Sequence, residues 1–523
     1  MIEQTVADLY ERAVRLGGDR TALTQGERSM SYRQLGENAA RLVNAFAAVG
    51  LGSGDRVAFL MANCMEYVAC EFAVARIGAV RVPLAVLLAN DDHVYMMNFA
   101  RCTTLVYHEK LAARVLEMQP QLTTVQHYVC VSEEPGRVPA GHLHLQALLQ
   151  AHDATPRAAP IDPEDLAGIY FTGGTTGRPK GVMLSHRSFV FTYYMELLDF
   201  GLGWHETFVF ATPLTHAAGC LLLPVLLRQG RCVILDHFDP ELLLGTIERE
   251  RATTTLLVPT MIYILLDHPR RDAFDLGSLR NVLYGAAAIA PERLKQAIER
   301  FGPVFTQFFG QTEAPMALTS LPRELHVVAD PVRQAMVLAS AGIPTHPTRI
   351  RLLDEQGHDV PEGEPGEIVA DAPNVMSGYL DDPAATAETL RDGWLHTGDI
   401  ARRDAEGYLT IVDRRKDMIV SGGFNIFPRE VEDALFAHQA VQQVAVIGVP
   451  DEKWGEQVKA LVVLREGMAA GEQELIDHVR SRKGSLMAPK SIEFVASIAL
   501  TNLGKIDKKA IRASYWAGRA RNV

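Results

Sequence analysis

One segment of the chain combines glycines, hydroxyl groups and positive charge in a pattern that suits a phosphate. Residues 172–181 read Thr-Gly-Gly-Thr-Thr-Gly-Arg-Pro-Lys-Gly and follow the apolar run 167–171. Glycines let backbone N–H groups turn toward a phosphate, the threonines add donors, and Arg178 and Lys180 supply positive charge. The segment predicts a nucleotide polyphosphate site between two strands, with candidate ligands Thr172, Gly173, Gly174, Thr175, Thr176, Gly177 and Lys180.

Other functions of glycine-rich loops lack their motifs in this chain. No GxxxxGK[ST] register fits the segment, and neither GxGxxG nor GxSxG occurs elsewhere. Walker-type kinase, dinucleotide-binding and serine-hydrolase functions therefore lose their main support.

Further segments place single reactive side chains among glycines and apolar residues. They read Pro-Leu-Thr-His-Ala-Ala-Gly at 213–219, Gly-Ala-Ala-Ala at 285–288, Phe-Gly-Gln-Thr-Glu at 309–313, Trp-Leu-His-Thr-Gly-Asp at 394–399 and Leu-Thr-Asn-Leu-Gly-Lys at 500–505. Each segment alone is weak, because an aspartate after Thr-Gly is usually a turn former and a lone histidine is usually structural. Their order along the chain is the informative feature.

Taken in this order, the segments resemble the motifs of the adenylate-forming superfamily, which holds acyl-CoA synthetases, peptide-synthetase adenylation domains and luciferases. The resemblance covers essentially the whole chain. It implies that ATP activates a carboxylate as an acyl-adenylate with release of pyrophosphate, and that a thiol then takes the acyl group. Bringing two anions together requires a metal ion, cations and preorganised hydrogen-bond donors.

The resemblance also implies roles for individual nucleotide-binding residues. Thr312 would contact the α-phosphate, Glu313 would coordinate Mg²⁺, and Lys505 would bridge the carboxylate and the α-phosphate. Asp399 would accept both ribose hydroxyls, with Arg414 as its partner. The segments around adenine and the α-phosphate would be Gly285, Ala286, Ala287, Phe309, Gly310 and Gln311.

The resemblance further implies a histidine beside the acid and a domain movement between two half reactions. His216 would lie between the carboxylate site and the acyl pocket. Lys416 aligns with the hinge of the family, and a rotation there would replace the Lys505 loop by a loop that lines the pantetheine tunnel. That loop contains Ser421, Gly422 and Gly423, whose small side chains leave width for a thin thiol arm.

The elements expected to position these residues change in character along the chain. Up to about residue 340, short apolar runs such as 55–60, 253–259, 279–284 and 304–309 alternate with helical patterns such as 32–49, which predicts βα units in two α/β sheets. Residues 342–413 show short alternating strands and predict a small β-barrel-like unit. We therefore expect an N-terminal adenylation domain over residues 1–413 and a small mobile α+β domain over residues 414–523.

Composition bounds the class of protein. The chain has 523 residues, a formal net charge of −12 and six cysteines without a CxxC pair. This negative net charge argues against a protein that binds nucleic acid through its overall charge. The N-terminus carries Glu3 where a signal peptide carries basic residues, and the apolar runs are broken by Pro224 and Pro259, so neither a secretory signal nor a spanning helix is predicted. We expect a reduced, cytoplasmic protein.

These observations favour an acyl-CoA synthetase that uses ATP, Mg²⁺ and CoA. Residues expected near the acid, including His216, Ala218, Tyr284 and the ranges 258–263 and 309–316, are largely apolar and contain no arginine for a second carboxylate. The sequence therefore favours a monocarboxylic acid with a hydrophobic body, and it leaves open a fatty chain, as in fatty acid metabolism, an aryl ring or an alicyclic skeleton. Two alternatives stay open, an enzyme that loads a carrier-protein phosphopantetheine and a non-catalytic nucleotide-binding protein; a homodimer also stays open.

Overall fold

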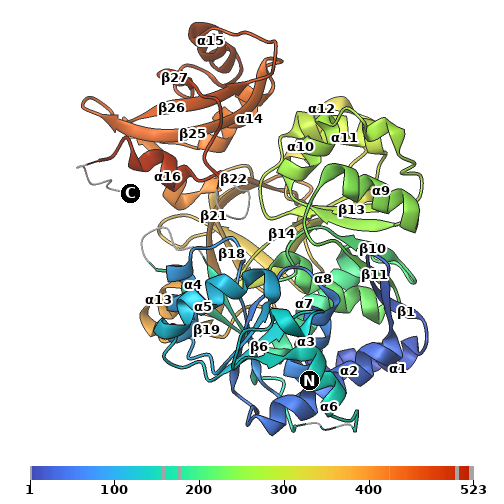
Figure 1. Cartoon of the computed structure of the whole chain (residues 1–523). Helices are drawn as coiled ribbons and strands as arrows, with labels where there is room; N and C mark the ends of the chain where they lie inside the picture. Colours follow the sequence, from blue (N-terminus) through green and yellow to red (C-terminus); the bar gives the residue numbers. More distant parts are fainter. Residues whose placement is uncertain are drawn as a thin grey trace.

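The structure, a computed structural model, describes residues 3–155, 157, 159–172, 178–422, 424–500 and 506–517. Four sheets organise these residues (Figure 1). Two large α/β sheets and a small antiparallel sheet form the N-terminal part of the chain, and the fourth sheet lies in a smaller α/β unit at the C-terminus. The predicted fold class, with two α/β sheets followed by smaller units, is confirmed.

The first large sheet has eight strands in the order β19-β9-β8-β4-β3-β5-β6-β7. The strands from β8 to β7 are parallel, whereas β9 runs antiparallel to both of its neighbours, β8 and β19. The strands are β3 (Arg56–Leu60), β4 (Val80–Pro83), β5 (Thr104–His108), β6 (His127–Val131), β7 (Leu143–His144), β8 (Leu166–Thr172), β9 (Lys180–Ser185) and β19 (Gly378–Tyr379).

The second large sheet has nine strands in the order β16-β15-β14-β13-β12-β10-β11-β1-β2. Its centre is parallel and both of its edges are antiparallel. The strands are β1 (Thr21–Gln25), β2 (Arg28–Ser31), β10 (Thr207–Phe210), β11 (Arg231–Ile234), β12 (Thr254–Leu257), β13 (Asn281–Gly285), β14 (Phe305–Gln311), β15 (Ala314–Leu321) and β16 (Ile343–Pro344).

Helices fill the space between these two sheets and cover their outer faces. Alternate residues of β3 show the layering, because Val57 and Phe59 join the core between the sheets while Ala58 and Leu60 join the core on the far side. The middle layer holds α1 (Val6–Gly17), α2 (Tyr32–Ala48), α3 (Met65–Arg76), α6 (Leu145–Ala151), α7 (His186–Asp199) and α8 (Ala217–Leu227). The outer layers are α4 (Asn90–Phe99) with α5 (Ala112–Met118), and α9 (Pro240–Glu250), α10 (Pro259–Asp267) and α11 (Pro291–Phe301).

The position of a helix in these layers follows from its sequence. Every residue of α3 is buried and α8 is apolar on all sides, as expected for helices covered by a sheet on each face. By contrast, α11 buries only Arg293, Leu294 and Ala297 and exposes charged residues. No helix among the described residues is long and apolar enough to cross a membrane.

The predicted small β unit is a five-stranded antiparallel sheet. Its strands are β17 (Arg349–Leu353), β18 (Gly366–Asp371), β20 (Leu390–Arg391), β21 (Trp394–Arg403) and β22 (Leu409–Arg414). α12 (Pro331–Ala339) precedes this sheet, and α13 (Pro383–Thr389) lies between β19 and β20. The predicted domain boundary at 413/414 falls at the last residue of β22.

The C-terminal unit is built on the long hairpin of β25 (Val441–Asp451) and β26 (Gly455–Leu464). β23 (Ile419–Ser421), β24 (Phe424–Ile426) and β27 (Ser491–Phe494) complete the sheet. α14 (Pro428–Phe436) and α15 (Glu472–Lys483) cover one face, and α16 (Lys508–Ala513) packs on the other. In Figure 1 this unit stands above the small β sheet, with α16 close to β22.

Candidate active site

The predicted phosphate loop joins two antiparallel neighbours of the first sheet. β8 ends at Thr172 and β9 begins at Lys180, and these two residues pair directly across the ladder. The strands on both sides of the loop are therefore where the sequence predicts them. Gly173, Gly174, Thr175, Thr176 and Gly177 lie outside the described residues.

Lys180 is brought to the predicted magnesium ligand through an aromatic side chain. The hydroxyl of Tyr379 donates a hydrogen bond of 2.7 Å to Oε1 of Glu313, and the ammonium of Lys180 lies 4.9 Å from the centre of the Tyr379 ring. β19 holds this tyrosine against β9. The sequence analysis missed Tyr379, because no motif links it to Glu313 across 66 residues.

Glu313 lies in the tight turn that joins β14 to β15. Gln311 pairs with Ala314 across the turn, and a Cβ atom on Gly310 would come within 2.7 Å of the backbone of Met316. Glycine is therefore required at this position of the segment. The turn brings Thr312 and Glu313 to the carboxyl end of β14, the edge at which ligands of parallel sheets usually bind.

The segment predicted to bind adenine lies on the neighbouring strand. Gly285 pairs with Phe308 between β13 and β14, and a Cβ atom on Gly285 would come within 2.4 Å of the Phe308 carbonyl oxygen. Ala286 follows with a φ of 63° and turns the chain away from the sheet. The residues expected at adenine and at the α-phosphate therefore lie on two adjacent strand ends, with Ala287 directly after the turn.

The predicted ribose pair forms on the small β sheet. Nε of Arg414 lies 3.3 Å from Oδ1 of Asp399, and the two residues face each other where β21 pairs with β22. Asp399 is buried; burial raises its pKa, while Arg414 and Lys416 act in the opposite direction. Glu313 is near enough to raise the pKa of Asp399 and of Arg414. Fold and charge thus gather Lys180, Glu313, Asp399 and Arg414 in one region.

His216 lies at the start of α8, after the carboxyl end of β10. Its N–H donates to the carbonyl of Pro213 at 3.1 Å, and its carbonyl accepts from Gly219 at 3.0 Å. The side chain is half-buried. β10 is separated from the adenine strand β13 only by β12, so the histidine stands along the same sheet edge as the nucleotide residues.

The expected hinge connects β22 to the C-terminal unit. Lys416 lies in a short 3-10 turn between Arg414 and β23, and burial lowers its pKa. Asp417 beside it binds Arg512 of α16 at 2.7 Å. The segment is therefore held by charges from the unit that follows it.

The expected tunnel loop is a hairpin between β23 and β24. Ser421 is buried and pairs with Phe424. Gly422 has a φ of 58°, donates to the Trp454 carbonyl at 2.8 Å, and would place a Cβ atom 2.5 Å from the Trp454 ring. Conformation and crowding both require glycine at 422. Gly423 lies outside the described residues.

Lys505 also lies outside the described residues. The chain on either side of its segment is tied together, because Leu500 and Ile506 form an antiparallel bridge and Asp507 N–H donates to the Ala499 carbonyl at 2.9 Å. The Asp507 side chain then caps α16.

One residue expected in the acid pocket faces elsewhere. Tyr284 is completely buried in the layer of α9, α10 and α11, where its hydroxyl lies 2.9 Å from Nε2 of His326. The expectation that Tyr284 lines the pocket is wrong for its side chain, because successive residues of a strand face opposite sides and Gly285 takes the other side.

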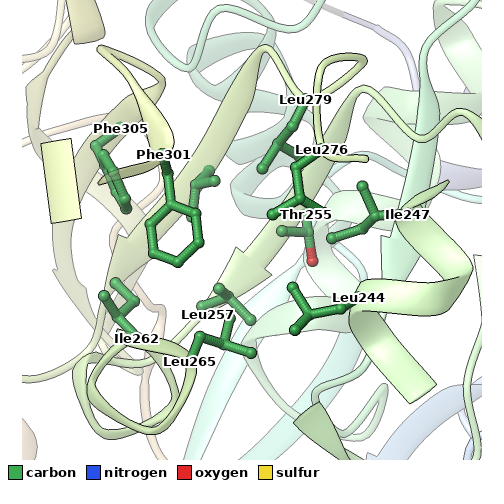
Figure 2. A pocket seen from close by; sticks show the side chains of 11 residues that line it. Leu244, Ile247, Thr255, Leu257, Ile262, Leu265, Leu276, Leu279, Phe301 and Phe305 are labelled. Carbon is green, nitrogen blue, oxygen red and sulfur yellow. The ribbon is translucent and has the colours of Figure 1, made fainter. Parts of the chain in front are cut away.

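A cavity in the same helix layer is too small to hold an acid. Figure 2 shows apolar side chains from α9, β12 and α10 converging on it, with Thr255 adding a hydroxyl group. Its volume of about 20 Å³ accommodates about one water molecule, whereas ligand pockets measure about 300–1,000 Å³. The cavity is a packing defect of the core.

Comparisons with known proteins agree with this geometry. Residues 10–380 match the AMP-binding enzyme family, and residues 430–505 match the AMP-binding enzyme C-terminal domain. The chain belongs to the AMP-binding enzymes. This membership confirms the resemblance inferred from the motifs, which is to adenylate-forming enzymes of the acyl-CoA synthetase type. The standard substrates of these enzymes include ATP and CoA, and their cofactor is Mg²⁺.

Individual relatives of this AMP-binding enzyme extend over nearly its full length. A medium/long-chain-fatty-acid–CoA ligase, FadD8, of Mycobacterium tuberculosis is 41% identical over 97% of this chain and 89% of its own. A feruloyl-CoA synthase of Amycolatopsis is 38% identical over 96% and 98%. The amide bond synthetase McbA of Marinactinospora thermotolerans superimposes with a TM-score of 0.89 at 32% identity, over 97% of this chain and 99% of its own.

Proposed function

We propose that this AMP-binding enzyme joins a hydrophobic monocarboxylic acid to CoA through an acyl-adenylate. The observation that carries the proposal is the convergence of Lys180, Glu313, Asp399 and Arg414 from two sheets and the β8–β9 hairpin. Cations at a polyphosphate, a carboxylate for a metal ion and a buried aspartate suited to a ribose are what acid activation by ATP requires.

The described residues fit a magnesium ion bound jointly with ATP. Tyr379 occupies one oxygen of Glu313, and no hydrogen bond from the described part of the chain reaches the other oxygen. Within the described ranges no three His, Cys, Asp or Glu side chains gather into a metal site. Mg²⁺ in nucleotide enzymes is held by one or two carboxylates plus phosphates, so Glu313 would suffice as the protein ligand. The ion would supply charge neutralisation at the phosphates.

In this proposal the chain's own residues divide the work of adenylation. Asp399 and Arg414 bind the ribose, Thr312 donates to the α-phosphate, and the close backbone approach at Gly285 and Gly310 leaves room for the nucleotide. Lys505 offsets the repulsion between the carboxylate and the α-phosphate. His216 contacts the acid further along the same sheet edge.

The acid is proposed from the chemistry of the pocket residues and from the relatives. The residues expected around it, in 258–263 and 309–316, carry no arginine that would recognise a second carboxylate. The ligase of Mycobacterium tuberculosis and the synthase of Amycolatopsis are named for fatty and feruloyl acids, both monocarboxylic with hydrophobic bodies. We therefore place dicarboxylic acids outside the substrate range.

The decisive experiment measures pyrophosphate release over fatty, aryl and alicyclic acids, with and without CoA. We expect release with at least one hydrophobic monocarboxylic acid and a CoA thioester without any carrier protein. A thioester that forms only on a carrier protein would contradict the choice of CoA, and absence of pyrophosphate release with every acid would contradict acid activation.

The role of Lys505 has its own test. Lys505→Ala should slow adenylate formation by about 10²- to 10³-fold, the effect of losing one preorganised electrostatic contact, and should spare thioester formation from a supplied acyl-adenylate. The control is Lys509→Ala, an exposed lysine of α16. Equal losses in both half reactions would contradict the assignment.

A further inference from the structure

One buried asparagine joins the two large sheets at the segment that leads to His216. Asn63 follows β3 in the first sheet, and its amide nitrogen donates to the carbonyls of Thr212 and Leu235, each at 3.0 Å. Its amide oxygen accepts from the N–H of Leu214 at 2.8 Å. Thr212 and Leu235 lie just beyond the ends of β10 and β11 in the second sheet, so a single side chain spans both sheets at their carboxyl edges.

The three partners determine how this amide is oriented. Two carbonyls require both N–H donors on one side, and one N–H requires the oxygen on the other. Asn63 is 6% exposed, so water cannot replace these partners. Neither a hydroxyl nor a carboxylate can supply the same two donors and one acceptor.

The backbone of Asn63 is itself held by β1. The side chain of Gln25 donates to the Asn63 carbonyl and accepts from the N–H of Met65, each at 3.2 Å. The same Gln25 amide donates to Asp236 at 2.7 Å. Asn63 is therefore anchored on its main chain as well as through its side chain.

The segment that Asn63 holds has little freedom of its own. The turn from Pro213 to His216 follows Thr212 directly and is closed by the hydrogen bond from the His216 N–H to the Pro213 carbonyl. Gly219 of α8 packs on this turn so closely that a Cβ atom there would lie 2.1 Å from the Leu214 carbonyl oxygen. A shift at Leu214 would therefore move the start of α8 and the histidine together.

We propose that Asn63 is a positioning residue for acid binding, acting through the turn that carries His216. It fixes the distance between that turn and the end of β3, and so sets where the imidazole meets the carboxylic acid. This inference rests on the proposed role of His216. In the part of the chain that the structure describes, the side-chain partners of Asn63 all lie just beyond β10 and β11. A substitution of Asn63 should therefore change the KM for the acid and not the KM for ATP.

The test compares Asn63→Ala with a matched buried asparagine. Asn281, 2% exposed, donates to the Phe200 carbonyl at 2.7 Å at the amino end of β13, the opposite edge of the same sheet. In pyrophosphate release by the full chain, Asn63→Ala should raise the KM for the acid about tenfold, within the range that follows a small misplacement of a binding group, and leave the KM for ATP within about twofold. Asn281→Ala should change neither KM.

A double-mutant cycle identifies the route of the effect. In a His216→Ala background, Asn63→Ala should raise the acid KM by less than about twofold, since the group it positions is gone. Additive effects, or equal rises in the KM for acid and for ATP, would overturn the proposal. If Asn63→Ala fails to fold, Asn63→Ser goes through the same cycle with the same criteria.

The outcomes also separate this inference from the proposed role of His216. A normal acid KM in His216→Ala would remove the role of the histidine and the inference with it. An effect of His216→Ala on the acid KM together with a normal acid KM in Asn63→Ala would overturn the inference alone.

Discussion

Two charge clusters, one buried and one partly buried, stabilise very different parts of the molecule. In the middle layer of the N-terminal part, Arg81 of β4 forms an ion pair with Glu71 of α3, and both side chains are at most 5% exposed. The guanidinium carbon of Arg81 lies 4.0 Å from the centre of the Phe189 ring, and the Tyr193 hydroxyl accepts a hydrogen bond from the guanidinium at 3.3 Å. Both charges of this pair belong to the N-terminal part of the chain, and aromatic rings cover the guanidinium.

The second cluster lies where β22 meets the C-terminal unit. Lys508 of α16 binds Glu432 of α14 at 2.9 Å and lies 3.9 Å from Asp413 at the end of β22. Arg512, one turn further along α16, binds Asp417. Here cations of α16 pair with Glu432 of their own unit and with Asp413 and Asp417, which lie on either side of Lys416.

The two clusters differ in what a movement of the C-terminal unit would do to their ion pairs. A rotation about Lys416 would leave Arg81 and Glu71 in contact, because both partners move together. The same rotation would separate Lys508 from Asp413. We infer that the first pair supports a permanent core, whereas the second favours one orientation of the C-terminal unit and must break when another is adopted.

The largest expected effect follows from breaking the core pair. Arg81→Met leaves Glu71 buried without its cation and should lower the free energy of unfolding by about 3–5 kcal/mol. Denaturant titration measures this loss. The ion pair is structural if the rates of both half reactions, measured on the folded fraction, fall by the same factor. An unchanged free energy of unfolding would contradict the comparison.

The next effect should appear in a pH titration of the region around Arg81. His186 is fully buried near Arg81, and burial lowers its pKa to about 4, with Arg81 adding to the effect. Between about pH 6.5 and pH 4 His186 binds a proton in the unfolded chain but stays neutral in the folded chain. The free energy of unfolding is therefore highest above this window and falls as the pH decreases within it, by about 3 kcal/mol at pH 4.

Asp417, the partner of Arg512 in the second cluster, should not titrate in that window. Burial alone would raise the pKa of Asp417, but Arg512 and Lys508 hold it below its ordinary value. Its contribution is therefore present above the ordinary pKa of a carboxyl group and is lost only at lower pH. His186→Gln should flatten the stability curve between pH 6.5 and pH 4, and an unaltered slope would count against this assignment.

At the hinge itself, Lys416→Pro restricts the backbone where the rotation would occur. We expect adenylation to stay within about threefold and thioester formation from a supplied adenylate to fall about tenfold or more, because the second orientation is no longer reached. Pyrophosphate-exchange and thioester assays on one preparation measure the two steps. Normal thioester formation would exclude a hinge at this residue.

The smallest expected effect comes from Lys508→Met, which removes the cation between Asp413 and Glu432. The ratio of the two half-reaction rates should change about tenfold, whereas the free energy of unfolding should fall by less than it does for Arg81→Met. Lys509→Met, on the exposed side of α16, is the matched control. An unchanged ratio would show that the cluster does not bias the orientation.

Much of the site could be predicted because its motifs are local. The strand–loop–strand at 166–185, the turn at Glu313 and the hairpin at Gly422 depend on short-range backbone geometry, in which glycine, φ and close packing leave few options. Contacts formed by single side chains from distant segments could not be predicted. Tyr379 on Glu313 and Asn63 on the His216 turn join residues 66 and about 150 positions apart.

By itself the sequence determined the family and predicted the order of the units and the nucleotide-binding residues, because each of these follows from a contiguous motif or from a hydrophobic period. Only the tertiary structure decided which side chains support those motifs, which face Tyr284 occupies, and which charges join α16 to the end of β22. The physical reason is that hydrogen bonds and ion pairs between distant segments depend on how layers pack, and packing is a property of the whole chain.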